Sequence, residues 1–261
     1  MSKLKILITV LFLGLGLGGA YFIISNSTAA APQAQNSNLD ITNNNPVGTE
    51  IATSTIASST ANLSEVLAKK IATEMAAANP NGTINVSGKN YVSAPKPENL
   101  ANDLYAEAQK NFDPNSLRPV IKDSDIKISD DNSKDALTNY FVSFNEIIIN
   151  NAKNIPQNIL SSNSDPQTSD FAQITDIYKK GIADFYSLSV PSKILDIDKK
   201  EIELLTTEKN IYQALANMDQ DPVTANLALN ELPNIYQEFD NLKITIDNFI
   251  KTNQLNINTL Q

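Results

Sequence analysis

Carboxylates are the side chains of this sequence with the most evident capacity for chemistry. The densest group consists of Asp123, Asp125, Asp130 and Asp131, in the stretch IKDSDIKISDDNS. Hard oxygen ligands at this density could bind Ca²⁺. However, Ile128 occupies the position at which an EF-hand loop begun at Asp123 needs glycine, and the position for the bidentate glutamate is not acidic. We therefore interpret these acids as weak metal candidates, and favour solvated acids flanking helices.

The residue types that are absent exclude many familiar mechanisms. The chain has no histidine and no cysteine, so it cannot form Ser-His-Asp or Cys-His nucleophile pairs, a thiolate zinc site or an imidazole-ligated metal. The glycines that follow the amino-terminal apolar run belong to no phosphate-binding loop; they are Gly48, Gly82, Gly88 and Gly181. We expect no cofactor, no catalytic residue and no enzymatic activity.

A carboxylate-based hydrolase stays open as an alternative, because a glycosidase requires two acids separated in space rather than in sequence. A cell-wall hydrolase would be the natural form of this enzyme for an exported chain. Against it, the sequence has no tryptophan to stack on sugar rings. Most tyrosines beyond the apolar run fall on or beside apolar helical stripes, which indicates core positions with a polar tip; they are Tyr105, Tyr140, Tyr178, Tyr186, Tyr212 and Tyr236.

The amino terminus predicts a membrane anchor. Residues 4–24 are apolar apart from Lys5, and at ~1.5 Å rise per residue a helix of this length crosses the hydrocarbon core of a bilayer. Lys3 and Lys5 lie on one side, and the first charge on the other side is Asp40. This asymmetry predicts a single-pass anchor at residues 1–25, with a cytoplasmic amino terminus and an extracytoplasmic body.

Two further interpretations concern the same segment. Small residues at 27–30 resemble a signal-peptidase site, so the alternative is a protein secreted after cleavage. Within the apolar run, Gly14 and Gly18 form a G-x-x-x-G pair, a spacing that lets two membrane helices approach closely. Self-association through this face is therefore a hypothesis.

The next segment predicts a spacer. Residues 26–60 consist mainly of Ser, Thr, Ala, Asn and Gln, with Asp40 and Glu50 as the charges. Too little apolar surface is available for burial, so we expect a flexible tether. The whole chain has a formal charge of −9, which does not favour nucleic acid as a partner.

Helical periodicity dominates the remainder. We expect accessory helices with loops and short extended segments at 61–131, a helical bundle at 132–254 and a flexible tail at 255–261. Apolar stripes predict helices at about 62–78, 97–112, 134–152, 169–185, 194–218 and 225–249, with Pro233 kinking or splitting the last. A minor hairpin is expected at 83–92 and an extended piece at 125–129. The predicted fold class is all-α: a transmembrane helix, a tether and an extracytoplasmic antiparallel bundle.

Three stretches carry a family resemblance: IKDSDIKISDDNSKDALTNYF, LSVPSKILDIDKKEIELL and DQDPVTANLALNELPNIYQEF, at 121–141, 188–205 and 219–239. The chain resembles uncharacterised, amino-terminally anchored helical proteins of reduced-genome bacteria of the candidate phyla. This resemblance implies a place near a pilus or secretion apparatus, and it transfers no catalytic residue. We expect a membrane-tethered interaction or scaffold protein that binds other envelope proteins. The alternative is a different functional class of protein, a solute-binding or sensing module with a concave apolar pocket.

Overall fold

The computed structural model describes residues 62–82, 84–86, 89–91, 93, 97–155 and 166–257. The predicted anchor at 1–25, the tether at 26–60 and the Gly14–Gly18 pair lie outside these residues. Within the described part the chain is mostly helical, with two small two-stranded sheets, as the sequence predicts for an all-α protein with a minor hairpin. No helix in these described ranges is long and apolar enough to cross a membrane.

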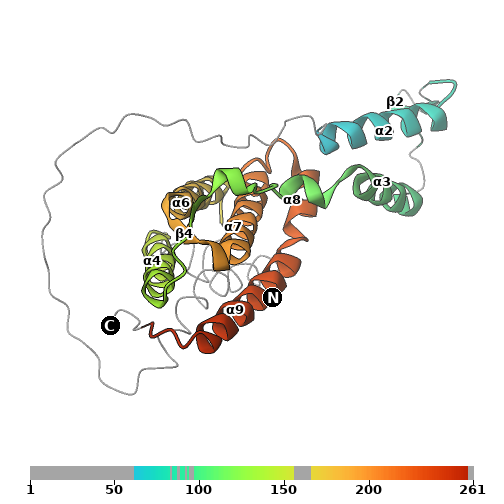
Figure 1. Cartoon of the computed structure of the whole chain (residues 1–261). Coiled ribbons are helices and arrows are strands. Elements are labelled where there is room, and N and C mark those ends of the chain that lie inside the picture. Colours follow the sequence, from blue (N-terminus) through green and yellow to red (C-terminus); the bar gives the residue numbers. More distant parts are fainter. Residues whose placement is uncertain are drawn as a thin grey trace, which may run out of the picture.

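Figure 1 shows a group of long helices from which a pair of helices projects to one side. The long helices are α4 (Lys134–Ala152), α6 (Thr168–Ser187), α7 (Leu195–Ala216) and α9 (Leu232–Thr252), with the short α8 (Pro222–Leu229) between α7 and α9. The projecting pair is α2 (Leu63–Ala78) and α3 (Pro97–Asn111). Single 3₁₀ turns lie at η1 (Pro114–Leu117), η2 (Asp123–Asp125) and η3 (Ser192–Ile194).

Polar caps start several helices at the positions that the sequence indicates. Asn62 accepts a hydrogen bond from the Glu65 backbone and begins α2, and Ser133 accepts one from the Ala136 backbone and begins α4. Each cap satisfies a backbone N–H that has no partner within the helix. The predicted bounds of α4 are confirmed, whereas α6 begins one residue before the predicted Ser169.

The two sheets differ in what their strands hold together. β1 (Ile84–Val86) and β2 (Lys89–Tyr91) pair antiparallel, which confirms the predicted hairpin. β3 (Lys127–Ser129) pairs in parallel with β4 (Ser189–Pro191), with Ile128 opposite Val190. The extended piece at β3 was predicted, but its partner strand was not. The second sheet therefore fastens the loop before α4 to the connector between α6 and α7.

The main core is built around α7. This helix packs against α6, α8 and α9, and also against β4, η1 and η3. As a result, its buried residues are distributed around the helix rather than on one stripe. The core side chains with the least exposure come from several elements and include Phe171, Ile174, Phe185, Val190, Ile194, Ile202, Leu204, Ile211, Tyr212, Leu232 and Ile235.

The structure shows where α7 ends and where α9 begins. The seven-residue spacing of Ile197, Leu204, Ile211 and Met218 predicts a single buried stripe on α7, but Met218 is 37% exposed because the helix ends at Ala216. The prediction for Met218 is therefore wrong. Pro233 lies at the start of α9 and separates it from α8, which confirms a split helix rather than a kinked one. Beyond α9, Leu255 is buried against the main core.

The α2–α3 pair, called here the arm, has a small core of its own. Leu63, Ala108 and Leu227 form its buried cluster, with Leu67 and Phe112 packed against them. Leu227 belongs to α8, so α8 is where the arm meets the bundle. Asp221 strengthens this joint, because it caps α8 through Thr224 and also accepts hydrogen bonds from the backbones of Leu63 and Ser64.

Candidate functional site

Three buried carboxyl groups on α7 are the most unusual chemical feature of the core. Asp198, Glu201 and Glu208 have exposed fractions of 0%, 5% and 1%. With Leu205 and Tyr212 they follow one another at intervals of three and four residues, so they share a face of the helix. We call these three acids the carboxyl stripe. Acidic side chains are rarely this deeply buried unless they are paired.

Asp198 is attached to α4 by one hydrogen bond. The Tyr140 hydroxyl donates to its Oδ1 atom over 2.6 Å, and Tyr140 is itself 4% exposed. Asp198 Oδ2 is buried and has no hydrogen-bond partner among the described residues. Burial raises the pKa of Asp198 to about 6, against the opposing effect of the Tyr140 hydrogen bond.

Glu208 lies among three tyrosines from three helices. Its Oε1 atom accepts hydrogen bonds from Tyr236 of α9 at 3.2 Å and from Tyr212 of α7 at 3.4 Å. Tyr178 of α6 is close enough to lower the pKa of Glu208, although its hydroxyl does not reach hydrogen-bond geometry. Burial outweighs these three hydroxyls and raises the pKa of Glu208 to about 7. Its Oε2 atom has no partner within the described ranges.

Glu201 lies between the other two acids along the helix and is the most strongly perturbed. Burial raises its pKa to about 8, and repulsion from Asp198 and Glu208 adds to the effect. In the described part of the chain no hydroxyl donates to it and no cation pairs with it. Each acid makes ionisation of its neighbours harder, so the three groups titrate as a coupled set.

The surrounding tyrosines stay neutral over the whole physiological range. Burial, followed by the nearby carboxyls, raises the pKa of Tyr140 well above its usual value. The pKa values of Tyr178, Tyr212 and Tyr236 are raised for the same leading reason. These hydroxyls can therefore donate hydrogen bonds to the acids but cannot supply charge to them.

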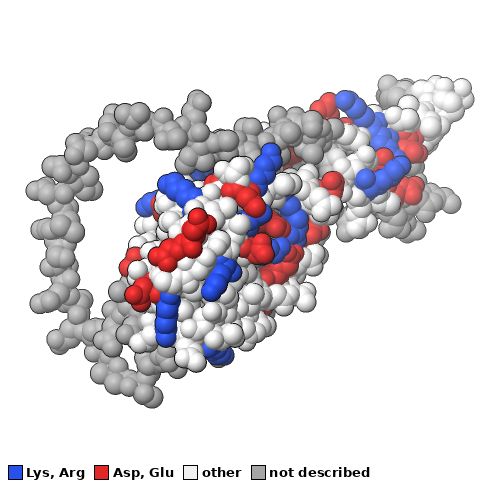
Figure 2. Space-filling view, viewed as in Figure 1, with Lys and Arg blue, Asp and Glu red and all other residues white. Residues whose placement is uncertain are grey.

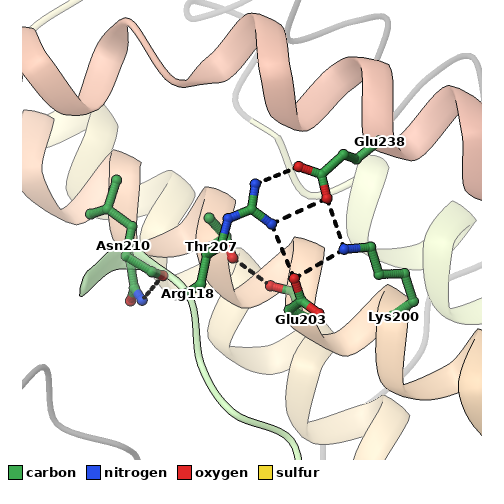
Figure 3. A network of polar contacts seen from close by, with 7 residues as sticks. Arg118, Lys200, Glu203, Thr207, Asn210 and Glu238 are labelled. Atoms are coloured by element: carbon green, nitrogen blue, oxygen red, sulfur yellow. Dashed lines mark hydrogen bonds and ion pairs between the residues drawn. The ribbon is translucent and has the colours of Figure 1, made fainter. Parts of the chain in front are cut away.

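The solvent side of α7 carries a different arrangement of charges (Figure 3). Arg118, the single arginine of the chain, lies between Glu203 of α7 and Glu238 of α9 and binds both carboxylates. Its Nη1 atom is 3.1 Å from Glu203 Oε1 and 3.1 Å from Glu238 Oε2. Lys200 joins the same pair at 3.0 Å and 2.7 Å. We call these four residues the charge clamp.

The clamp fastens the loop after η1 to the two helices. Arg118 follows Leu117, whose carbonyl accepts a hydrogen bond from the buried Asn210 of α7 at 2.8 Å (Figure 3). Arg118 holds the pKa of Glu238 below its usual value, with burial opposing and Lys200 adding to the effect. Unlike the stripe, this network pairs every carboxylate with cations.

Two shallow grooves flank the clamp. One is lined by Asp196, Lys200, Glu238 and Leu242, between α7 and α9. The other is lined by Val120, Asp196, Lys199 and Lys200, beside the loop after η1. Figure 2 shows acidic and basic side chains interspersed over the bundle face in view. The grooves therefore present charges of both signs at a solvated surface.

The predicted metal candidates do not converge on one point. Asp123 forms an ion pair with Lys199 at 2.5 Å, and Asp125 accepts a hydrogen bond from the Lys122 backbone at 3.1 Å. Asp131 accepts from the Ser133 backbone at 2.9 Å, just before α4, and Asp130 is exposed. No group of three or more acids in the described residues could hold a metal ion.

Sequence reasoning missed the carboxyl stripe. It assigned no role to the acids of α7, because an acidic position on an amphipathic helix normally faces water. The missed signal is the spacing of Asp198, Glu201, Leu205, Glu208 and Tyr212, which is the spacing of a buried stripe. The expectation that tyrosines lie in the core with a polar tip is confirmed for Tyr140, Tyr178 and Tyr212.

Comparison with known proteins adds no relative. No family model matches the sequence, and no similar chain was found among curated proteins or solved structures. Function is therefore argued from the geometry of this chain.

Proposed function

We propose that this chain is a membrane-tethered, extracytoplasmic interaction or scaffold protein of the cell envelope, without catalytic activity. The observation that carries this proposal is the incompletely covered apolar stripe of α2. Leu63 at the start of this helix is 5% exposed, whereas Ile71 further along is 38% exposed. Val66, Leu67 and Met75, on the same stripe, are only half-buried.

The arm is a reasonable place for a partner to bind. Its buried cluster is small, and α2 packs mainly on α3 and α8 among the described elements. A short helix in water gains most of its stability from packing an apolar face, so covering the rest of this stripe would stabilise α2. Helix-in-groove binding uses anchors at this spacing. We infer that an envelope protein covers Ile71 and Met75.

The amino-terminal sequence supports the location. An apolar run at residues 4–24 behind basic residues is typical of a signal anchor, and the polar segment at 26–60 would let the body reach a partner at some distance from the bilayer. A pilus or secretion apparatus is the assembly that the family resemblance implies. The alternative is secretion after cleavage near residues 27–30, and the immunoblots described below distinguish the two.

Two details of the bundle favour an interaction role over the alternatives. The cavity between α4 and α6, lined by Asn151, Tyr178 and Gly181, has a volume of about 20 Å³, room for about one water molecule, and the larger spaces beside the charge clamp are open grooves lined in part by charged side chains rather than enclosed apolar pockets. A glycosidase needs one protonated and one ionised carboxyl across a groove. Glu238 lines a groove but is held ionised by Arg118, while the acids with raised pKa values are buried.

The test is site-specific photocrosslinking of the full chain in native membranes. A photoreactive residue at Ile71 should capture an envelope protein, and the same residue at Lys69, exposed on the other side of α2, should capture much less. Immunoblots of membrane and medium should show the chain at its full size in the membrane. Failure of position 71 to capture any envelope protein would overturn the binding role, and a shortened product in the medium would overturn the tether.

A further inference from the structure

Neutral hydroxyl groups from three helices besides α7 lie close to the carboxyl stripe. α4 contributes Tyr140, α6 contributes Tyr178 and Tyr186, and α9 contributes Tyr236, while Tyr212 lies on α7 itself. Among the described residues no lysine or arginine is within ion-pair distance of these acids. Arg118 and Lys200 pair with Glu203 and Glu238 in the charge clamp, and Lys199 pairs with Asp123.

An ionised carboxylate in this position has no cation beside it, and the hydroxyl groups of Tyr140, Tyr212 and Tyr236 reach only one oxygen of Asp198 and one of Glu208. Removing a charge from water is unfavourable unless a partner of opposite charge or several hydrogen bonds replace the lost hydration. Asp198 Oδ2 and Glu208 Oε2 receive no hydrogen bond from the described residues, and Tyr178 leaves its hydroxyl unpaired close by. A protonated carboxyl avoids the charge and can itself donate a hydrogen bond. The observed packing of the helices is therefore more favourable when these acids are protonated than when they are ionised.

We propose that the carboxyl stripe is a proton-operated lock: the packing of α4, α6 and α9 around α7 is tight when Asp198, Glu201 and Glu208 are protonated, and loosens when they ionise. The lock is a property of the bundle and is independent of the partner proposed for the arm. In an extracytoplasmic protein, such a lock would make the packing of the bundle depend on the pH outside the cytoplasm.

The contacts indicate where loosening begins. The Tyr140–Asp198 hydrogen bond joins α4 to α7, and the Tyr236–Glu208 hydrogen bond joins α9 to α7. Glu201 lies between them without a partner, so its charge acts on both ends of the stripe. Ionisation at Glu201 therefore weakens the packing on α4 and α9 together.

The direction of the pH dependence follows from raised pKa values. Between the ordinary pKa of a carboxyl and its raised value in the fold, the folded chain holds a proton that the unfolded chain has lost. Stability therefore falls as pH rises from about 4.5 to about 8 and levels off above that range. For each such proton the unfolding equilibrium constant increases about tenfold per pH unit.

The experiment is urea unfolding of the full chain in mild detergent at pH values from 4.5 to 8.5, together with amide hydrogen exchange. We expect the unfolding constant to increase at least about tenfold per pH unit near pH 6, with faster exchange in α4 and α9 at high pH. Glu201→Gln should flatten the profile partly, and the triple variant D198N/E201Q/E208Q should flatten it almost fully. Glu146→Gln, at an exposed position of α4, is the matched control and should follow the wild type.

A pH-independent wild-type unfolding constant over this range would overturn the lock, as would an unchanged slope in the triple variant. If the triple variant does not fold, infrared spectra of the wild type replace it. Acidification from pH 8 to pH 6 should then produce a protonated carboxyl band that is much weaker in the same difference spectrum of the urea-unfolded chain. Failure to see this band would equally overturn the proposal.

Discussion

The two faces of α7 handle acidic side chains in opposite ways. On the solvent side, Glu203 shares Arg118 and Lys200 with Glu238 of α9 (Figure 3). On the inner side, Glu201 is only two positions away along the chain, yet it has no cation among the described residues. The same residue type on the same helix is therefore an ion-pair partner on one face and a buried acid on the other.

The difference gives the two faces opposite pH dependences. The pKa of Glu238 is lowered, mainly by Arg118, so the stabilisation from the clamp is present above the ordinary pKa of Glu and is lost as pH falls below it. The pKa values of the carboxyl stripe are raised, so its contribution to stability is lost as pH rises toward 8. Stability should therefore be greatest in mildly acidic solution, between the two regimes.

The largest effect should come from removing the central buried acid. Glu201→Leu replaces a carboxyl that is ionised at high pH by an apolar side chain of similar volume. We expect the free energy of unfolding to increase by roughly 2–4 kcal/mol at pH 8.5, and by much less at pH 4.5, where the acid is neutral. Urea unfolding at the two pH values measures the difference.

Glu203→Leu is the matched control on the outer face of the same helix. It removes one carboxylate from the charge clamp, and should decrease the free energy of unfolding at pH 8.5 by about 0.5–1 kcal/mol. Equal effects of the two substitutions, in sign and size, would show that the two faces do not differ as described.

A smaller effect is expected from the hydrogen bond that joins α4 to the stripe. Tyr140→Phe leaves Asp198 Oδ1 without its donor, and should cost about 1 kcal/mol at pH 5 and about 2 kcal/mol at pH 8, where the acceptor is charged. The pKa of Asp198 should increase further, because this hydrogen bond lowers it. Carboxyl chemical shifts followed over a pH titration test the second expectation. A pKa that stays the same or falls would contradict it.

The contact between the arm and the bundle contains an acid whose carboxylate has hydrogen-bond partners, in contrast to the buried Glu201. Asp221 receives backbone hydrogen bonds from Leu63 and Ser64 of α2 while it caps α8. Asp221→Ala should therefore cost about 1 kcal/mol, confined to the arm and to α8, which loses its cap. Hydrogen exchange should accelerate in α2 and stay unchanged in α6. Asp219→Ala, two residues away at an exposed position, is the control and should leave both helices unaffected.

The smallest effect concerns the geometry of the clamp. Arg118→Lys keeps the charge but loses the fork that contacts both Glu203 and Glu238. We expect a loss of about 0.5 kcal/mol in the free energy of unfolding at pH 7, measured by urea unfolding at low salt. The difference should shrink in high salt, because these side chains are partly exposed. A loss that is independent of salt would indicate packing rather than charge.

Local chemistry explains why the helices could be predicted. Ser133 caps α4, Asp221 followed by Pro222 opens α8, and Pro233 separates α8 from α9. Each of these signals acts over a few residues, so the sequence contains all the information that it needs. The partner of β3 could not be predicted in the same way, because β4 is distant along the chain and comprises only Ser189–Pro191.

The candidate site depended on long-range packing. The stripe at Ile197, Leu204 and Ile211 predicted one buried face of α7, and that face is confirmed. Asp198 and Glu208 are buried as well, because α6, α8 and α9 all pack on this helix. A helical pattern predicts which residues share a face, but it does not say how many of the faces are covered.

The sequence by itself determined the helical class, the caps and the absence of histidine and cysteine chemistry, because residue identity and short spacings decide each of these. Only the tertiary structure decided which acids are buried and which are paired with cations. Glu201 and Glu203 are the same residue two positions apart, and what distinguishes them is whether the tertiary structure buries the carboxyl group or brings a cation to it.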